Sequence, residues 1–248
     1  PGQNTTLYAK WTINSYTISF NVNGGSAVTS ITQNYATAVT QPADPTKTGY
    51  TFAGWYSDAG LTSSYTFTTM PAENITVYAM WTINSYTISF VSNGGSAVGS
   101  ITQNYGTAVS QPADPTKTGY TFGGWYSDAG LTSSYTFTTM PGQNTTLYAK
   151  WTINSYTITF NSNGGSAVSS ITQNYGTAVT QPANPTKTGY TFGGWYSDAG
   201  LISPYTFTTM PAENITLYAK WTANLYVLEF RDYNGTILQT GSYAFESS

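Results

Sequence analysis

Large apolar residues and small polar residues alternate along several short stretches of this chain. In residues 16–20, which read Tyr-Thr-Ile-Ser-Phe, every second side chain is large and apolar. The same alternation runs through residues 74–81, where Ile75, Val77 and Ala79 share one face. A period of two is typical of a β-strand with one buried face. Both stretches are therefore predicted to be strands.

Turn signals and further extended runs lie between these two strands. Asn23 and Gly24 form the Asn-Gly pair that supplies the positive-φ residues of a tight turn. The apolar residues of 27–39 are irregularly spaced, which predicts an extended run with a bulge. Residues 50–56 are aromatic and strand-like, and the small pair at 53–54 indicates a second bulge.

One segment between the strands carries the signals of a short helix. Residues 44–49 read Asp-Pro-Thr-Lys-Thr-Gly. Asp suits the N-cap, Pro the first helical position and Gly the C-terminal stop. We predict one helical turn capped by Asp44, and by Asp114 and Asn184 at the equivalent positions further along the chain. The exchange of Asp for Asn keeps the cap and removes the charge, which favours a structural role.

The whole pattern recurs every 70 residues without insertion. Residues 16–85 and 86–155 are identical at 59 of 70 positions, and a third copy follows. A unit of this length can close a small core of its own. The predicted domains are 1–15 as the C-terminal end of a preceding repeat, 16–85, 86–155 and 156–225 as modules 1, 2 and 3, and 226–248 as the start of a diverged further module. Four residues, Thr82 to Ser85, are predicted to link the first two modules.

The motifs of one module resemble those of the Listeria-Bacteroides repeat family, the B-repeat of internalin-type bacterial surface proteins. The resemblance rests on Asn-Gly-Gly, on the aromatic run that follows Pro-Thr-Lys-Thr-Gly, and on the closing Tyr-Ala-x-Trp. It implies an α+β, mainly β fold of tandem ubiquitin-like β-grasp modules, each with a mixed sheet and one short helix. It also implies an extracellular place, at the bacterial cell surface or secreted.

The composition excludes much of catalytic chemistry. The chain has no His and no Cys, so it has neither a Ser-His-Asp triad nor a thiolate or imidazole metal site. Its 7 basic and 10 acidic side chains give a net charge of −3, which is no footprint for nucleic acid. Its apolar runs are too short to insert into a membrane.

Acidic residues are too few and too variable to form a catalytic or metal site. Glycoside hydrolysis needs two carboxylates, and only Asp58, with Asp128 and Asp198, recurs in every copy. A lone Asp is more readily explained as a turn former. We therefore expect no enzyme activity, no catalytic residue, no cofactor and no metal.

Aromatic side chains are the remaining functional resource. The repeated Trp-Tyr pair could stack on sugar rings, whereas a small domain also needs large side chains for its core. The candidate platform residues are Trp55, Tyr56, Trp125, Tyr126, Trp195 and Tyr196. Core packing is the favoured interpretation of the tryptophans.

These features predict a non-enzymatic stalk that projects a functional domain from a bacterial surface. The alternative is a weak multivalent adhesin segment that binds glycan or host protein through exposed aromatics repeated in each module. Neighbouring repeats are the expected partners in either case. Strand-mediated self-association through the partial repeats at the two ends is also expected, because unpaired strand edges recruit strands.

Overall fold

The computed structural model describes residues 2–245, and these residues form β-strands, turns and irregular segments without any helix. Module 1 holds β1 (Ser15–Asn21), β2 (Ile31–Asn34), β3 (Tyr50–Tyr56) and β4 (Ile75–Ile83). Module 2 holds β5 (Ser85–Val91), β6 (Ile101–Asn104), β7 (Tyr120–Tyr126) and β8 (Thr145–Ile153). Module 3 holds β9 (Ser155–Asn161), β10 (Ile171–Asn174), β11 (Tyr190–Tyr196) and β12 (Ile215–Ala223), and a last hairpin holds β13 (Leu225–Arg231) and β14 (Ile237–Ala244).

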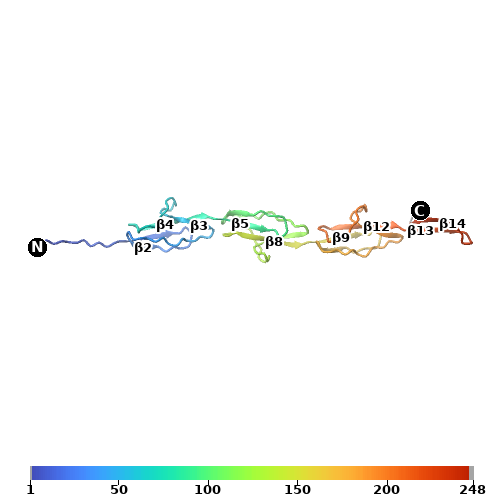
Figure 1. Cartoon of the computed structure of the whole chain (residues 1–248), viewed down its shortest axis with the longest axis horizontal. Helices are drawn as coiled ribbons and strands as arrows, with labels where there is room; N and C mark the ends of the chain where they lie inside the picture. The colour runs from blue at the N-terminus through green and yellow to red at the C-terminus, as the bar shows by residue number, and fades with distance from the viewer. Residues whose placement is uncertain (1, 246–248) are drawn as a thin grey trace. The chain divides into compact units, whose positions relative to one another are not determined.

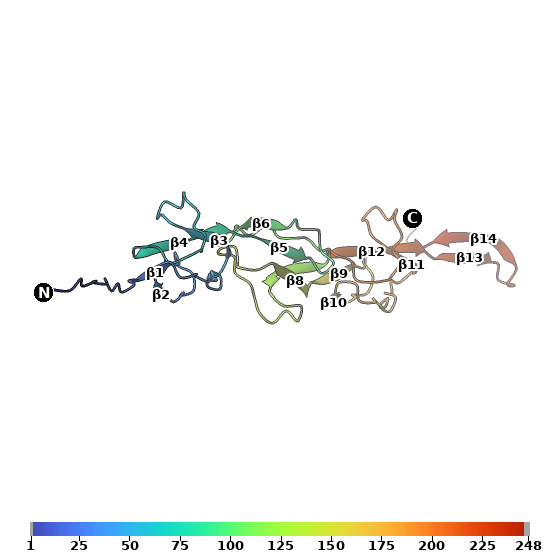
Figure 2. The same cartoon turned by 60° about the vertical axis from the view of Figure 1, so that its left-hand side comes forward.

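Each module contains one mixed four-stranded sheet. In module 1 the strand order is β2-β1-β4-β3, and the other two modules repeat it. The central pair, β1 and β4, is parallel, while β2 and β3 run antiparallel to their neighbours at the two edges. The first and last strands of a module therefore lie side by side in the middle of its sheet (Figures 1 and 2).

The period-two pattern of the sequence sets which face of the sheet is buried. Ile18 on β1 and Val77 and Ala79 on β4 are fully buried, and Trp55 from β3 and Met70 close the core over them. The polar residues between them lie on the other face or at the edges. The predicted alternation of the first and last strands is thus confirmed.

The turn and the bulge predicted from glycine positions are also present. Asn23 and Gly24 both have positive φ, at 46° and 82°. The register of β3 against β4 shifts between Phe52 and Gly54, as expected of a bulge at the small pair. The long extended run predicted over 27–39 is reduced to β2, because only four of its residues pair with β1.

The predicted helical turn is wrong, and with it the β-grasp fold class. The Ser26 amide donates to Thr46 O at 2.8 Å, and the Thr46 amide donates to the Ser26 hydroxyl at 2.9 Å. A tight turn follows, in which the Tyr50 amide donates to Lys47 O. A six-residue helix is costly to nucleate, and in the folded module the Thr46 backbone instead gains hydrogen bonds to Ser26, 20 residues earlier in the chain. The residues predicted as helix caps, Asp44, Asp114 and Asn184, therefore have no helix to cap.

The described chain divides into two compact units. The first comprises residues 1–91, 98–113 and 125–148, and the second comprises 92–97, 114–124 and 149–248. All of module 1 lies in the first unit and all of module 3 in the second. The module boundaries derived from the repeat stay a prediction.

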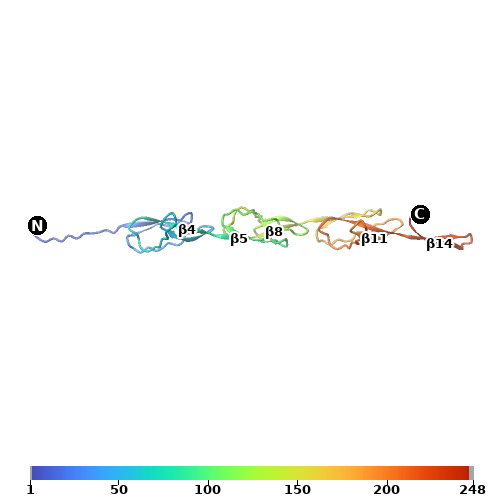
Figure 3. The same ribbon diagram turned by 90° about the horizontal axis from the view of Figure 1, so that it is seen from above.

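The two ends of the chain differ in structure. Residues 2–14 form no strand, and Leu7, Tyr8 and Trp11 are each 90% exposed. β13 and β14 form a two-stranded antiparallel ribbon (Figure 3). Residue 1 of the predicted segment 1–15 and the last three residues of 226–248 lie outside the described residues. Self-association through these ends stays a prediction.

Candidate functional site at the module joints

Consecutive sheets are connected by a single residue rather than by the predicted four-residue linker. β4 ends at Ile83 and β5 begins at Ser85, so Asn84 stands alone between them. Asn154 and Asn224 hold the same place after β8 and β12. So short a connection leaves little freedom to the backbone, and the surroundings of these asparagines decide whether it can bend.

Asn84 is held by hydrogen bonds from both of the modules that it connects. Its amide donates to Gly49 O at 2.9 Å, and its carbonyl oxygen accepts from the Tyr105 amide at 2.8 Å. Its side-chain Oδ1 accepts from Thr51 Oγ1 at 2.7 Å, and its Nδ2 donates to the Tyr86 hydroxyl at 3.3 Å. Gly49 and Thr51 belong to module 1, whereas Tyr86 and Tyr105 belong to module 2.

The ring of Tyr105 completes the contact by lying over Gly49. A β-carbon on Gly49 would overlap the Tyr105 ring, and the φ of +79° at Gly49 independently favours glycine. The ring also meets Tyr50 and Tyr86 edge-on, with centroids 6.0 Å and 6.5 Å away. Edge-to-face pairs at this spacing are favourable. We call the set Gly49, Thr51, Asn84 and Tyr105 joint 1; it lies within the first unit.

The same arrangement recurs twice in the second unit. Joint 2 consists of Gly119, Thr121, Asn154 and Tyr175, and joint 3 consists of Gly189, Thr191, Asn224 and Phe245. The Asn amide donates to the Gly carbonyl at 2.9 Å in both joints. In joint 3 the ring is a Phe, which still covers its glycine and meets Tyr190 edge-on at 5.7 Å. The contact therefore depends on the ring and not on its hydroxyl.

Module 1 offers an internal comparison for the joint. Asn14 and Tyr35 are the equivalents of Asn84 and Tyr105, and the Tyr35 amide still donates to Asn14 O at 2.8 Å. The ring of Tyr35 lies over no described glycine. Tyr35 is 48% exposed, whereas Tyr105 is half-buried. Docking against the preceding module is what shields the ring.

Sequence reasoning missed the joint residues. The signal that could have found them is the period itself. Tyr105 and Tyr175 lie 19 residues after Tyr86 and Tyr156, and Phe245 lies 19 residues after Tyr226. The ring position therefore continues into the diverged segment, where most of the module sequence has changed.

The tryptophans of the candidate sugar platform lie in the core. Trp55 is 3% exposed, and Trp125 and Trp195 are each 2% exposed. The Trp55 ring packs edge-on against Phe20 at 4.8 Å and Phe52 at 5.3 Å. A buried indole cannot stack on a sugar from solvent, so the fold uses these rings for packing.

The tyrosines of the same platform are half-buried. Tyr56 lies opposite Tyr78 on β4, and its backbone forms a bridge with Ser64. Tyr196 has the ammonium of Lys220 4.9 Å from its ring centroid, and Tyr126 is half-buried as well. Each tyrosine is thus separated from a core tryptophan by one peptide bond and turned to the other face of its strand.

The recurring aspartate organises a loop. Asp58 Oδ2 accepts from the Ser63 amide at 2.8 Å, and both carboxylate oxygens accept from the Thr62 amide at 3.2 Å. The hydrogen bond from the Ser63 backbone is the main reason that the pKa of Asp58 lies below its usual value. Asp128 and Asp198 make the equivalent bonds. The expectation of a turn former agrees with these contacts.

The recurring lysine pins the Asn-Gly turn. Lys47 Nζ donates to Asn23 O at 2.8 Å, and it lies 4.5 Å from the centroid of the Tyr50 ring and 5.7 Å from that of Trp81. Lys117 and Lys187 make the same contacts in modules 2 and 3. The ammonium therefore lies between the turn and the rings of Tyr50 and Trp81.

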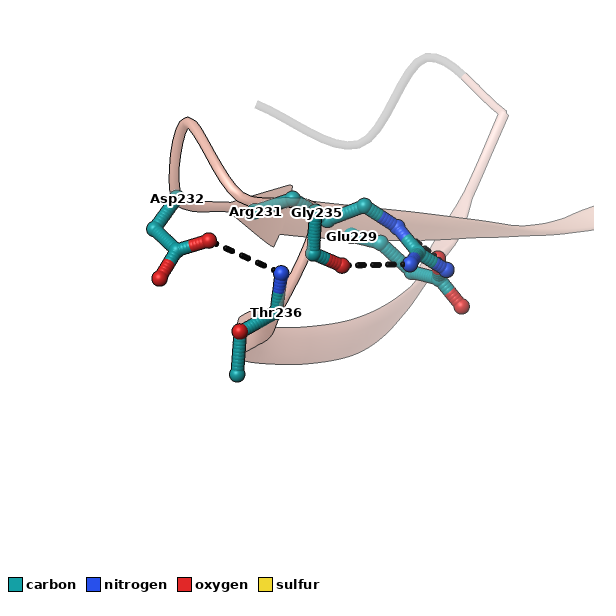
Figure 4. Close-up of polar contacts among 5 residues, drawn as sticks. All are labelled: Glu229, Arg231, Asp232, Gly235 and Thr236. Atoms are coloured by element: carbon teal, nitrogen blue, oxygen red, sulfur yellow. Dashed lines mark hydrogen bonds and ion pairs between the residues drawn. The ribbon is translucent and has the colours of Figure 1, made fainter.

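The last hairpin has its own turn chemistry, shown in Figure 4. Asp232 Oδ1 accepts from the Thr236 amide at 2.8 Å, and Arg231 Nη1 donates to Gly235 O at 2.8 Å. Arg231 also forms an ion pair with Glu229 on the same strand. These contacts replace the lysine-pinned turn of the complete modules.

Neither a metal-ligand cluster nor a membrane-spanning helix occurs in residues 2–245. No group of three His, Cys, Asp or Glu residues gathers there as a metal site. No helix in that part of the chain could cross a membrane.

Known proteins share this repeat. The Listeria-Bacteroides repeat domain matches residues 16–80, 86–150 and 156–220. A protein of Evansella cellulosilytica named "Putative membrane protein" is 44% identical over 248 residues, covering 98% of this chain and 37% of that protein. A "Putative Gly-rich membrane protein" of the same organism is also 44% identical, covering 93% of this chain and 27% of that protein. Internalin H of Listeria monocytogenes is 40% identical over 171 residues, covering 65% of this chain and 30% of that protein.

The chain thus spans about a third of the length of these relatives. The three family matches cover most of it and coincide with the three sheets and their loops. The chain belongs to the Listeria-Bacteroides repeat domain family.

Proposed function

We propose that this region is a non-enzymatic spacer of a bacterial surface protein, in which each module is held at a fixed angle to the next. The joints carry the proposal. A flexible tether needs no tertiary contact at its linkers, whereas here one asparagine makes backbone and side-chain bonds on both sides and a ring covers a glycine. Four hydrogen bonds to one residue restrict the backbone rotation of that residue, which is the only connection between the two sheets.

The relatives support the cellular setting of the proposal. Two of them are named as membrane proteins and one as an internalin. A surface protein needs distance between its anchor and its functional part, and copying one module adjusts that distance. The near-identity of modules 1 and 2 fits recent adjustment by duplication.

The adhesive alternative has less support. The alternative predicts repeated exposed aromatics, so it needs one in the same place in every module. Within residues 16–225 the one aromatic that is largely exposed is Tyr35, and its equivalents are the docked rings of the joints. Binding of glycan or host protein stays a prediction, and no repeated exposed aromatic surface in residues 16–225 supports it.

Small-angle X-ray scattering of the 248-residue chain tests the spacer. If the joints hold, the maximum dimension should reach at least about 90 Å, as expected for three 70-residue modules in line. Replacing both ring residues, Tyr105→Ala and Tyr175→Ala, should broaden the distance distribution. A compact particle of about 60 Å would contradict the proposal.

A further inference from the structure

The pairing of the first and last strands decides how a module responds to a pull along the chain. β1 pairs with β4 in parallel, with Ile18 opposite Ile75 and Asn21 opposite Tyr78. β5 pairs with β8, and β9 with β12, in the same way. The chain runs into each module through the first of these strands and out through the second.

Parallel strands that are pulled from their outer ends slide past each other. The chain joins the pair at one end and leaves it at the opposite end, so tension acts along the strands in opposite directions. All the hydrogen bonds between the strands then carry load together. An antiparallel pair pulled from its open end instead breaks one bond after another. The bonds of a parallel ladder are evenly spaced, which spreads the load.

A side-chain bond extends the ladder where β1 begins. Asn74, the residue before β4, accepts a hydrogen bond from the Thr17 amide through Oδ1 at 2.8 Å. Asn144 and Asn214 do the same for Thr87 and Thr157 at 2.9 Å and 2.8 Å. The asparagine therefore adds one more link between the first and last strands.

Two further side chains extend the ladder at its other end. Trp81 Nε1 donates to Val22 O at 3.0 Å, and Asn23 Nδ2 donates to Ala79 O at 2.7 Å. Modules 2 and 3 repeat both bonds at 2.7–2.8 Å. Strand sliding would have to break these bonds at the same time as the ladder.

Sliding would also open the core. Ile18, Val77 and Ala79 lie on the paired strands and are fully buried. Moving β1 by one residue along β4 would reverse the faces of its side chains. The apolar core therefore adds to the resistance of the hydrogen bonds.

We propose that the parallel pair, with the side-chain bonds at both of its ends, is a load-bearing clamp that keeps each module folded under tension. This function goes beyond that of a spacer. A spacer needs fixed joints. A chain under tension also needs modules that stay folded when the surface and the distal part of the protein are pulled apart.

Single-molecule stretching tests the clamp on the full chain. Held by its two ends, the chain should unfold in three steps, one for each module, and each step should add about 210 Å, the extended length of 70 residues less the span of the folded module. A second attachment at Thr40→Cys, pulled against the N-terminus, first loads the short pairing of residues 36–39 with 68–70. It then loads β1 and β2 from the end where Ser15 faces Asn34. Module 1 should open at clearly lower force in this second geometry. Equal forces in the two geometries would overturn the proposal.

Matched variants test the side-chain bonds. Asn74→Ala, Asn144→Ala and Asn214→Ala together remove the bond between first and last strands, and each module should unfold about fivefold faster at constant force. Ser15→Ala, Ser85→Ala and Ser155→Ala remove equally short bonds that join the first strand to its other neighbour, to Asn34, Asn104 and Asn174. This control set should leave the forced unfolding rate unchanged. Equal acceleration by the two sets would overturn the proposal.

The comparison of pulling geometries needs only the Cys attachment, so it stands even if the asparagine variant fails to fold. Scattering measures how far the joints keep the chain extended, and stretching measures the force at which each module unfolds. Failure of the clamp can therefore be distinguished from failure of the spacer.

Discussion

Two glycines of module 2 have the same backbone conformation and different surroundings. Gly119 has a φ of +79° and lies beneath the Tyr175 ring, while Gly106 has a φ of +75° with open space where a β-carbon would be. Module 1 has Ala36 in place of Gly106, at a φ of 64°. The backbone conformation alone therefore tolerates alanine, and the ring above Gly119 is the stricter constraint.

Gly119→Ala should destabilise the chain by about 2–4 kcal/mol, because the methyl group collides with the docked ring and adds to the backbone strain. Gly106→Ala is the matched control, and it should cost about 1 kcal/mol or less. Denaturant unfolding of the two variants measures both free energies. Equal losses would show that the ring does not constrain Gly119.

Among the elements, the segment predicted as a helix is the most instructive. It contains good helix-capping residues, yet Lys117 reaches across to Asn93 O and the Tyr120 ring instead of lying at a helix end. The lysine thus joins the turn after the first strand to the turn before the third strand of the sheet. Its hydrogen-bond partner, Asn93, lies 24 residues away in the sequence, beyond any local signal.

Lys117→Met should cost about 1–3 kcal/mol, because it removes a charged hydrogen bond and a cation–π contact while keeping most of the apolar stem. Lys150→Met is the control, since module 1 has Met80 at that position. Thermal unfolding followed by circular dichroism compares the variants. A Lys117 variant as stable as the control would rule out the pinning role.

The sequence predicts those parts of the fold that depend on local chemistry. Period-two alternation located the first and last strands, and glycine located the turn at Asn23 and the bulge near Gly54. The local pattern did not reveal the joints, because the Tyr105 ring contacts a glycine in another module, and only the 70-residue period marks the ring position. The sequence kept Trp55 among the ligand candidates while favouring core packing, and the burial of Trp55 agrees with the favoured interpretation.

Across the whole molecule, the three modules are connected by joints that repeat as regularly as the modules themselves. Each joint uses Gly, Thr, Asn and an aromatic ring at the same spacing, and the diverged hairpin keeps its ring position as Phe245. Where repeats contact only their neighbours, stability and stiffness depend on the modules and on the interfaces between them. We expect the joints to fix the angle between successive modules.

The most direct test of fixed joints is the distance between equivalent positions in successive modules. The chain has no Cys, so Ser30→Cys and Ser100→Cys, both exposed and 70 residues apart, can carry a pair of spin labels across joint 1. Tyr105→Ala should loosen the joint, and Tyr35→Ala, which changes the undocked equivalent, is the matched control.

Pulsed electron paramagnetic resonance should then give one narrow distance distribution for the otherwise unchanged chain and for the Tyr35→Ala control. It should give a clearly broader distribution for Tyr105→Ala. A broad distribution in the chain with its joint intact, no narrower than that of the Tyr105 variant, would contradict the account.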